Sequence, residues 1–328
     1  MPVASAGVSR GAPAVRAMGG AVYGRPHDAP EAEPVGVSIW LLRAVWVTLP
    51  VTAGPAAANA LVDWSTAPQV VAAVLLWGAW ACVLLSVLAP RPLGLTALRV
   101  VAPVFFALAV IAAVAADASA VAAGGAVVAT GVATVLAVTP AIAIAAANGI
   151  AYGAERRFPL KTPPVLLLGP LPLAPLVVGA GVATGPLLIA ADQPVIGAIV
   201  TVAGLPLAAI MARALHGLSR RWVVLVPAGL VLADPLTLPD PVLFLRERIV
   251  SLHAVDPRAA VAPGTVDLRL GGLADSLGMT LDREAEFLFT RSGLRGAAPA
   301  RGTEVWFAAV RSRELLATAA ERRIRVGR

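Results

Sequence analysis

Residues 69–117 read QVVAAVLLWGAWACVLLSVLA, PRPLGLTALR and VVAPVFFALAVIAAVAAD, which are two long apolar runs separated by a short basic segment. About 20 apolar residues in a helix are enough to cross the ~30 Å hydrocarbon core of a bilayer. Each run therefore suits one crossing. Arg91 and Arg99 mark one side of the membrane, and Asp117 marks the other side.

The same alternation of charge continues along the chain. Three linkers carry one acid each and no Lys or Arg, whereas the linkers between them carry the basic residues: Asp63, Asp117 and Asp192 against Arg91, Arg99, Arg156, Arg157 and Lys161. Basic residues in short loops stay on the cytoplasmic side. The pattern predicts a multi-pass protein of the plasma (inner) membrane with both termini in the cytoplasm.

Six stretches are apolar enough to be spans, namely residues 44–62, 69–89, 100–116, a long run from 120 to 154, 165–191 and 195–212. The whole chain is 58% hydrophobic and 14% charged, and its mean hydropathy is +0.82. Soluble domains usually carry about 25% charged residues. The composition therefore favours a helical membrane bundle within residues 35–216.

Prolines predict irregular helices. Pro50 and Pro55 should kink the first span. The fourth run is longer than one perpendicular crossing needs, so it either tilts or kinks at Pro140, with its end near Asn148 in the cytoplasm. We expect Trp46 near an end of its span, where indole rings favour the membrane interface.

The composition changes after residue 213, where short apolar runs alternate with turns. Residues 222–226, a turn at 227–229 and residues 230–233 predict a β-hairpin. Further strands are expected at 242–245, 249–252, 266–270, 286–290 and 304–310, and a helix is expected at 314–323. Residues 217–328 thus predict a small β-rich cytoplasmic domain closed by a C-terminal helix, whereas residues 1–34 predict a disordered cytoplasmic tail.

Two stretches carry a family resemblance. Residues 219–231, SRRWVVLVPAGLV, resemble the opening hairpin of bacterial PH-like domains in actinobacterial membrane proteins. Residues 148–157, NGIAYGAERR, are similar to a juxtamembrane stretch of uncharacterised proteins of that kind. The resemblance implies a PH-like domain on a multi-pass protein of unknown activity, and it supplies no catalytic residues. PH-like folds often bind lipids or peptides, but the first loop, 227–229, is uncharged here.

The best polar cluster consists of Asn148, Tyr152, Glu155, Arg156 and Arg157. If the fourth helix continues, the first three share one face through i,i+4 and i,i+3 spacing. The cluster then forms a polar site at the cytoplasmic mouth or a docking surface for the β-rich domain. The alternative is a positive-inside anchor with an interfacial tyrosine.

Catalytic and metal patterns are weak. The sequence contains no Gly-rich phosphate loop and no nucleophile elbow, and its single cysteine, Cys82, excludes a cysteine metal site. Asp234, Asp240 and Asp256 are expected to be solvated loop charges, and His216 and His253 structural. We therefore expect no catalytic residues and no cofactor.

Partners follow from the distribution of charge. Arginines and acids are interleaved from residue 213 onward, without a nucleic-acid motif, so we expect no nucleic-acid partner. The bilayer itself is a partner, and anionic lipid head groups or a cytoplasmic or membrane protein are further candidates.

Two functions remain open besides that of a membrane enzyme, for which the sequence offers no nucleophile–base pair and no metal set. One is a scaffold, sensor or regulatory subunit with a cytoplasmic interaction domain. The alternative is a transporter or channel for a neutral or lipidic molecule, with a cavity lined by Asn148, Thr139 or Ser119. The expected spans contain no ionisable residue, which disfavours a proton-coupled carrier.

Overall fold

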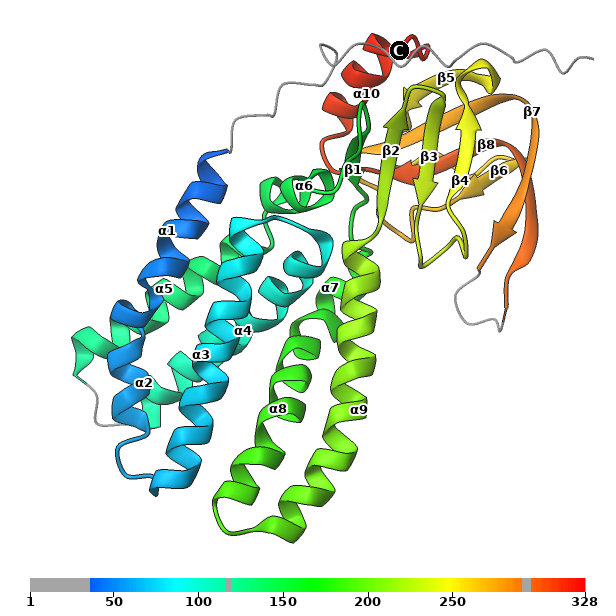
Figure 1. Ribbon diagram of the computed structural model, residues 1–328. Helices are drawn as coiled ribbons and strands as arrows, with labels where there is room; N and C mark the ends of the chain where they lie inside the picture. Colours follow the sequence, from blue (N-terminus) through cyan, green and yellow to red (C-terminus); the bar gives the residue numbers. More distant parts are fainter. Residues whose placement is uncertain (1–35, 116–118, 291–295, 328) are drawn as a thin grey trace, which may run out of the picture.

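The computed structural model describes residues 36–115, 119–290 and 296–327. The predicted disordered tail, 1–34, and the marker Asp117 lie outside these ranges. The described chain forms a group of long helices and, at one end of it, a domain of two β-sheets (Figure 1).

Within the described residues, six helical segments are long and apolar enough to cross a membrane, which confirms the predicted multi-pass architecture. They are α1–α2 (Val37–Thr52 and Gly54–Ala60), α3 (Thr66–Leu88), α4 (Pro92–Ala115), α5 (Ala120–Ala137), α8 (Pro170–Ala190) and α9 (Pro194–Ser219). The turns α2–α3 and α8–α9 lie at the end away from the β-sheets (Figure 1). Asp63 and Asp192 belong to these two turns.

The helices are interrupted near the prolines, as the sequence predicts. The first span is interrupted at Ala53, between Pro50 and Pro55. The fourth run ends as α5 and restarts with Pro140 as α6 (Pro140–Asn148), so it kinks rather than tilts as one helix. Before α8, the short helix α7 (Pro164–Leu168) ends at Gly169.

The helices are longer than the predicted spans at the end near the β-sheets. Arg43 lies inside α1, Arg99 lies inside α4, and α9 continues past Arg213 and His216. The predicted spans, which begin at residues 44 and 100 and end at residue 212, are therefore shorter than these helices. A helix continues past an apolar run as long as its backbone bonds are satisfied, and hydropathy does not report that limit.

Arg43 and Arg99 instead cap the C-terminal ends of neighbouring helices. Arg43 donates to the carbonyl oxygens of Val87 (3.2 Å) and Leu88 (3.3 Å), at the end of α3. Arg99 donates to the carbonyl of Ala137 (3.2 Å), at the end of α5. The last carbonyls of a helix have no partner within it, and a cation suits that end.

Trp46 is buried in the bundle rather than placed at the interface as expected. Its indole Nε1 donates to the carbonyl of Trp80 (3.0 Å), and Trp80 Nε1 donates to the carbonyl of Trp46 (2.9 Å). Its ring also stacks on Phe105 at 5.9 Å between centroids. A paired indole N–H removes the reason for the residue to seek the interface, so packing between α1 and α3 decides its position.

Small residues bring α8 and α9 together. A Cβ atom added at Gly181 would lie 2.6 Å from the carbonyl oxygen of Gly204, and one at Gly185 would lie 2.0 Å from Thr201 Oγ1. Helices in lipid associate by such close backbone approach. α4 contacts both helices of this pair as well as α3 and α5, so it joins the two halves of the bundle.

The β-domain contains two four-stranded sheets, in the orders β1-β2-β3-β4 and β5-β7-β8-β6. The strands are β1 (Arg156–Pro159), β2 (Trp222–Val226), β3 (Gly229–Ala233), β4 (Val242–Leu245), β5 (Ile249–Ala254), β6 (Thr265–Asp267), β7 (Ser276–Phe289) and β8 (Ala298–Ala308). All pairs are antiparallel except β6 with β8. β2 has the predicted limits, β3 begins one residue earlier than predicted, at Gly229, and α10 (Ser312–Glu321) is close to the predicted helix.

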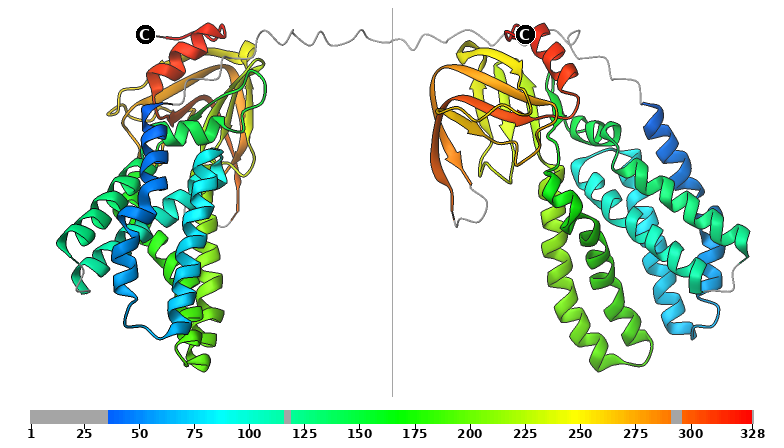
Figure 2. Two further views of the ribbon diagram at one scale, coloured as in Figure 1. Left: turned by 60° about the vertical axis from the view of Figure 1, so that its left-hand side comes forward. Right: turned by 180° about the vertical axis from the view of Figure 1, so that it is seen from behind.

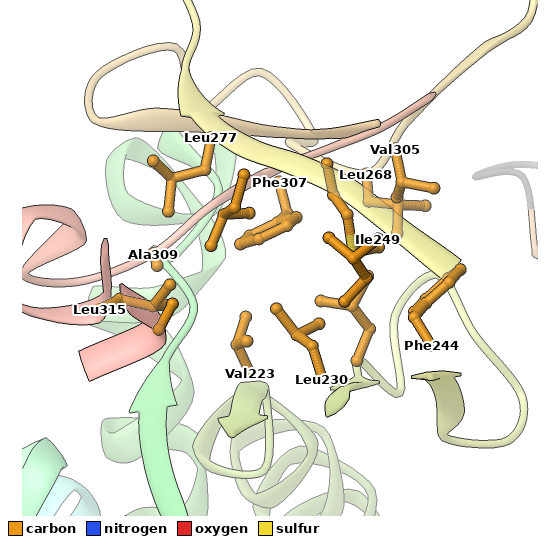
Figure 3. Packing of buried hydrophobic residues seen from close by; sticks show 14 of the residues in the cluster. Val223, Leu230, Phe244, Ile249, Leu268, Leu277, Val305, Phe307, Ala309 and Leu315 are labelled. Carbon is orange, nitrogen blue, oxygen red and sulfur yellow. The ribbon is translucent and has the colours of Figure 1, made fainter. Parts of the chain in front are cut away.

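The two sheets and α10 share one apolar core. Val223 and Leu230 from the first sheet face Leu277 and Phe307 from the second, and Leu315 of α10 closes one end (Figure 3). These side chains alternate along their strands with outward-facing residues, as in a half-buried sheet.

Three features of the β-domain differ from the sequence analysis. β1 lies in the linker between α6 and α7, where no strand was expected. β7 begins at Ser276 and β8 begins at Ala298, well before the strands predicted at 286–290 and 304–310. β6 ends at Asp267 because Leu270 has a positive φ of 51°, so the strand expected at 266–270 turns away from the sheet.

Candidate functional site

The predicted polar cluster lies where the bundle meets the β-domain. α6 ends at Asn148, the chain turns through 149–155, and β1 begins at Arg156. Asn148, Tyr152 and Glu155 therefore do not share a helical face. Pairing of β1 with β2, from Arg156 opposite Leu225 to Pro159 opposite Trp222, replaces the helical hydrogen bonds that a longer α6 would have made.

Asn148 fastens the end of α6 to β1. Its Nδ2 donates to the carbonyl oxygens of Ile144 and Arg157, both at 2.9 Å, and its Oδ1 accepts from the Arg157 amide at 2.9 Å. One side chain thus closes a helix C-terminus and pairs with a strand backbone in both directions. An amide can do this because it carries donors and an acceptor.

Gly149 holds the same junction against the α3–α4 turn. A Cβ atom at Gly149 would lie 1.9 Å from the carbonyl oxygen of Pro90. Its φ of −64° is ordinary for any residue, so the close approach alone requires glycine here. The end of α6 is therefore packed on the turn that carries Arg91.

The remaining cluster residues have different surroundings. Tyr152 is 83% exposed. Glu155 Oε2 accepts from Arg157 Nη2 at 2.9 Å, and the Arg157 guanidinium lies 5.2 Å from the Trp222 ring centroid. Arg157 thus covers Trp222, the first residue of β2, and this contact holds the α6–α7 linker against the β-domain.

Arg156 connects β1 to α10. Its Nη2 lies 2.6 Å from Glu314 Oε1, and Glu314 Oε2 also accepts from Arg311 at 3.2 Å. At the other end of α10, Arg322 donates to the carbonyl oxygens of Leu225, at 2.7 Å, and Ala154. Burial, and next the positive charge of Arg156, lower the pKa of Arg322 from its ordinary value. The C-terminal helix is therefore held on the linker at both ends.

A buried ion pair lies at the entry to β2, and the sequence analysis missed it. Arg221 Nε is 2.6 Å from Asp234 Oδ1 and Nη2 is 2.8 Å from Oδ2, with side chains only 2% and 1% exposed. Arg221 Nη1 also donates to the carbonyl of Lys161 at 2.7 Å, and Asp234 accepts from the Leu236 amide at 3.1 Å. The expectation that Asp234 is a solvated loop charge is wrong.

The register of the predicted hairpin indicates that Arg221 and Asp234 lie opposite each other. Trp222 lies opposite Ala233 in the β2–β3 register. The next residue outward on each strand is Arg221 and Asp234, so opposite charges directly face each other at the base of the hairpin. A bidentate pair of this kind fixes the orientation of both strands.

A second polar group crosses the outer face of the second sheet. Glu304 accepts from Trp306 Nε1 at 2.8 Å and lies 3.3 Å from His253 Nε2. Gly278 leaves room for this imidazole, because a Cβ there would lie 2.7 Å from His253 Nε2. Arg269 covers Trp306 at 4.5 Å. These groups bind one another across three strands and stiffen the sheet.

The polar groups suggested as cavity lining in a transporter bind backbone instead. Thr139 Oγ1 donates to the carbonyl of Leu136 at 2.8 Å, and Ser119 Oγ accepts from the Ala122 amide at 3.3 Å. Asn148 is engaged as described above. A cavity of about 20 Å³ near the β-domain end lies between apolar residues such as Ile39 and Leu42. Hydrogen bonds within the bundle thus occupy these three side chains.

Across residues 36–115, 119–290 and 296–327, no three His, Cys, Asp or Glu side chains come together in a way that could hold a metal ion.

Comparison with known proteins gives no match: no family model, no curated protein and no solved structure matches the chain.

Proposed function

We propose that the protein is a membrane-anchored scaffold, sensor or regulatory subunit, whose β-domain is a cytoplasmic interaction module. One observation carries this proposal: β1, a strand of the β-domain, is part of the linker between α6 and α7. Phe158 and Leu160 of this linker are buried in the core of the β-domain. The β-domain is therefore joined to the bundle by three chain connections, into β1, out of β1 and from α9 into β2.

Such a connection suits a module that reports on, or is positioned by, the bundle. Asn148, one of the polar residues suggested as transporter lining, is engaged at this junction, where it joins α6 to β1. Arg221 binds Asp234 across the β2–β3 hairpin and also the carbonyl of Lys161, 60 positions earlier in the chain. A movement of α6 or α9 is transmitted directly to a strand of the β-domain.

The distribution of charge supports a cytoplasmic β-domain. The α2–α3 and α8–α9 turns, which carry Asp63 and Asp192, lie at the far end of the bundle (Figure 1). Arg156, Arg157 and Lys161 belong to the linker that enters the β-domain. By the positive-inside rule the β-domain end faces the cytoplasm of a cell whose plasma membrane the helices span.

A PH-like fold for the β-domain remains part of this proposal. Two mainly antiparallel four-stranded sheets around one core, with a C-terminal helix over one end, support it. The short strand β6, which pairs in parallel with β8, is an addition to the predicted series of strands.

Orientation is tested first, with reporters fused to the full chain after Asp192 and after Arg325. Alkaline phosphatase is active only outside the cytoplasm and green fluorescent protein folds only inside it. We expect phosphatase activity after Asp192 and fluorescence after Arg325. Fluorescence after Asp192 combined with phosphatase activity after Arg325 would contradict the proposed cytoplasmic β-domain.

The interaction role is tested by photo-crosslinking in cells. A benzoylphenylalanine replaces Leu243, which is 48% exposed on the edge strand β4, and a matched control replaces Val202, which faces outward on α9. We expect a discrete protein adduct from Leu243 and lipid adducts from Val202. Absence of any protein adduct at Leu243, together with flux of glycerol or urea into liposomes above that of protein-free liposomes, would favour the transporter instead.

A further inference from the structure

The strands β7 and β8 form an arm that leaves the β-domain on the side from which the long helices extend. After an irregular stretch between Thr280 and Ala285, the pairing resumes and continues from Ala285 opposite Gly302 to Phe289 opposite Ala298. In Figures 1 and 2, whose views share a vertical axis, the free ends of both strands lie to one side of α9, point in the direction in which α9 extends away from the β-domain, and lie below the β-domain end of α9. The arm is thus directed at the membrane and not away from it.

The length of α9 places the free ends of β7 and β8 near the membrane surface. α9 has 26 residues, which span about 39 Å at 1.5 Å per residue, whereas the hydrocarbon core is about 30 Å thick. Its first charged residue is Arg213, so the last turns, up to Ser219, extend beyond the apolar run. The end of α9, and the ends of β7 and β8 just below it, therefore lie in the interfacial layer.

The exposed side chains of the arm change from charged to apolar along residues 285–289 and 298–301, as they do in elements that contact a membrane. Farther from its end, Glu286 and Arg301 form an exposed ion pair at 3.1 Å; the hydrogen bond to Glu286 raises the pKa of Arg301. Nearer its end, Leu288 is 50% exposed, and Ala298 and Pro299 are exposed as well. Within residues 285–289 and 298–301, the apolar side chains lie nearer the bilayer than the ion pair does, which matches the polarity gradient at a bilayer surface. The connecting residues 291–295 add Arg291 and Arg295, and basic residues suit anionic head groups.

The other face of the arm is held in place by the β-domain. Phe287 is buried and meets Phe244 edge to face at 6.0 Å between centroids. The Thr290 amide donates to the carbonyl of Thr237 at 2.7 Å, which ties the arm to the β3–β4 connection. The exposure of Leu288 is therefore built into the fold.

We propose that residues 285–289 and 298–301 form a foot on which the β-domain rests on the bilayer, with Leu288, Ala298 and Pro299 at the boundary between head groups and acyl chains. The occupant of this surface is the lipid of the membrane that the six helices cross. A foot of this kind, opposite the attachment at β1 and β2, holds the β-domain at a fixed tilt. The inference requires only that the bundle spans a membrane, and it does not depend on the proposed function.

Site-directed spin labelling of the full chain tests the foot. Cys82 is the single cysteine, so Cys82→Ser gives the background for Leu288→Cys and for the matched control Val250→Cys. Val250 is 42% exposed and belongs to β5, a strand at the end of the β-domain away from the helices (Figure 1). Each protein is labelled with a nitroxide and placed in nanodiscs of phosphatidylcholine and phosphatidylglycerol. Power saturation then compares collisions with oxygen, which enters lipid, and with a water-soluble nickel chelate.

We expect a ratio of oxygen to nickel-chelate collisions several-fold higher at Leu288 than at Val250, because only the first label is in lipid. Pro299→Cys should repeat this result from the neighbouring strand, and it replaces Leu288→Cys if that variant does not fold. Equal ratios at the arm and at Val250 would overturn the proposal. Nanodiscs of phosphatidylcholine alone distinguish two sources of contact: an unchanged ratio indicates apolar insertion, whereas a ratio that falls to the control value would overturn the apolar contact in favour of attraction to anionic head groups.

Discussion

At the scale of single residues, several polar side chains around the junction of the bundle and the β-domain connect different elements of the chain. Asn148, Arg221 and Asp234 each bind groups that belong to other elements. Desolvation makes a buried charge expensive, so such a group persists only when its partners are complete. Removing one partner is therefore more damaging than removing an exposed pair.

Asp234→Ala should destabilise the protein strongly. It leaves the Arg221 guanidinium buried without its carboxylate, a situation that costs about 3–5 kcal/mol. The matched control is Asp282→Ala, which removes the exposed partner of Arg248 and should cost about 0–1 kcal/mol. Chemical denaturation followed by tryptophan fluorescence measures both changes, and equal losses would contradict the role assigned to the buried pair.

The double variant Arg221→Met with Asp234→Leu extends this test. Apolar residues of similar volume often replace a buried ion pair without loss of stability. We expect the double variant to be more stable than Asp234→Ala alone, in the same denaturation assay. A double variant that is less stable than the single one would show that the bonds to Lys161 and Leu236 carry the stability instead.

Asn148→Ala should loosen β1 from α6. The variant loses two donated bonds and one accepted bond, so it should cost about 1–3 kcal/mol. Hydrogen–deuterium exchange should become faster at the Arg157 amide, which donates to Asn148. Tyr152→Phe, from the same cluster but 83% exposed, should leave exchange unchanged; faster exchange in that variant would indicate that Tyr152 belongs to the junction.

At the scale of elements, close backbone contacts decide which helices and turns meet. Gly181 and Gly204 join α8 to α9, and Gly149 joins α6 to the α3–α4 turn. A glycine in a helix has an entropic cost, so its presence at these contacts reflects the space that a side chain would occupy. Other glycines have no such neighbour, and Gly78 in α3 is one of them.

Gly149→Ala should lower stability although its backbone conformation suits alanine. The added methyl group would lie 1.9 Å from the Pro90 carbonyl oxygen, so α6 or the α3–α4 turn must move, at a cost of about 1–3 kcal/mol. Gly78→Ala meets nothing within 4 Å and should be neutral or stabilising by up to about 1 kcal/mol. Thermal unfolding in detergent compares the two variants; a similar melting temperature for both would remove the contact as the explanation.

At the scale of the whole molecule, the β-domain and the bundle are not consecutive pieces of chain. The first sheet needs β1, which comes from the middle of the helical region, and the core needs Phe158 and Leu160. A fragment that begins at residue 217 therefore lacks an edge strand and leaves the Val223 side of the core uncovered. Its exposed edge of β2 is also open to pairing with other chains.

Residues 217–328 expressed alone should fold poorly and aggregate for this reason. The same segment preceded by residues 154–163 and a flexible linker should be soluble and should give a dispersed amide NMR spectrum. A matched version of this longer fragment, with Phe158→Asp and Leu160→Asp in the added strand, should behave like the short fragment. A well-dispersed spectrum from the short fragment would show that β1 is dispensable.

The sequence by itself determined the features that depend on local composition. Long apolar runs predicted six spans, prolines predicted the breaks at Ala53 and before Pro140, and the alternation around 227–229 predicted the β2–β3 hairpin. Each of these depends on residues within about 20 positions of one another, so a pass along the chain detects them.

Only the tertiary structure decided how these pieces are joined. β1, the bond from Arg221 to the Lys161 carbonyl and the helix-closing roles of Arg43 and Arg99 depend on partners that lie far away in the sequence. A short charged segment such as Glu155–Arg156–Arg157 has no pattern that selects a strand, and it becomes one because the edge of β2 supplies its hydrogen bonds. Free energy from such long-range contacts is absent from local sequence, and here it determines that the β-domain is built on the membrane bundle.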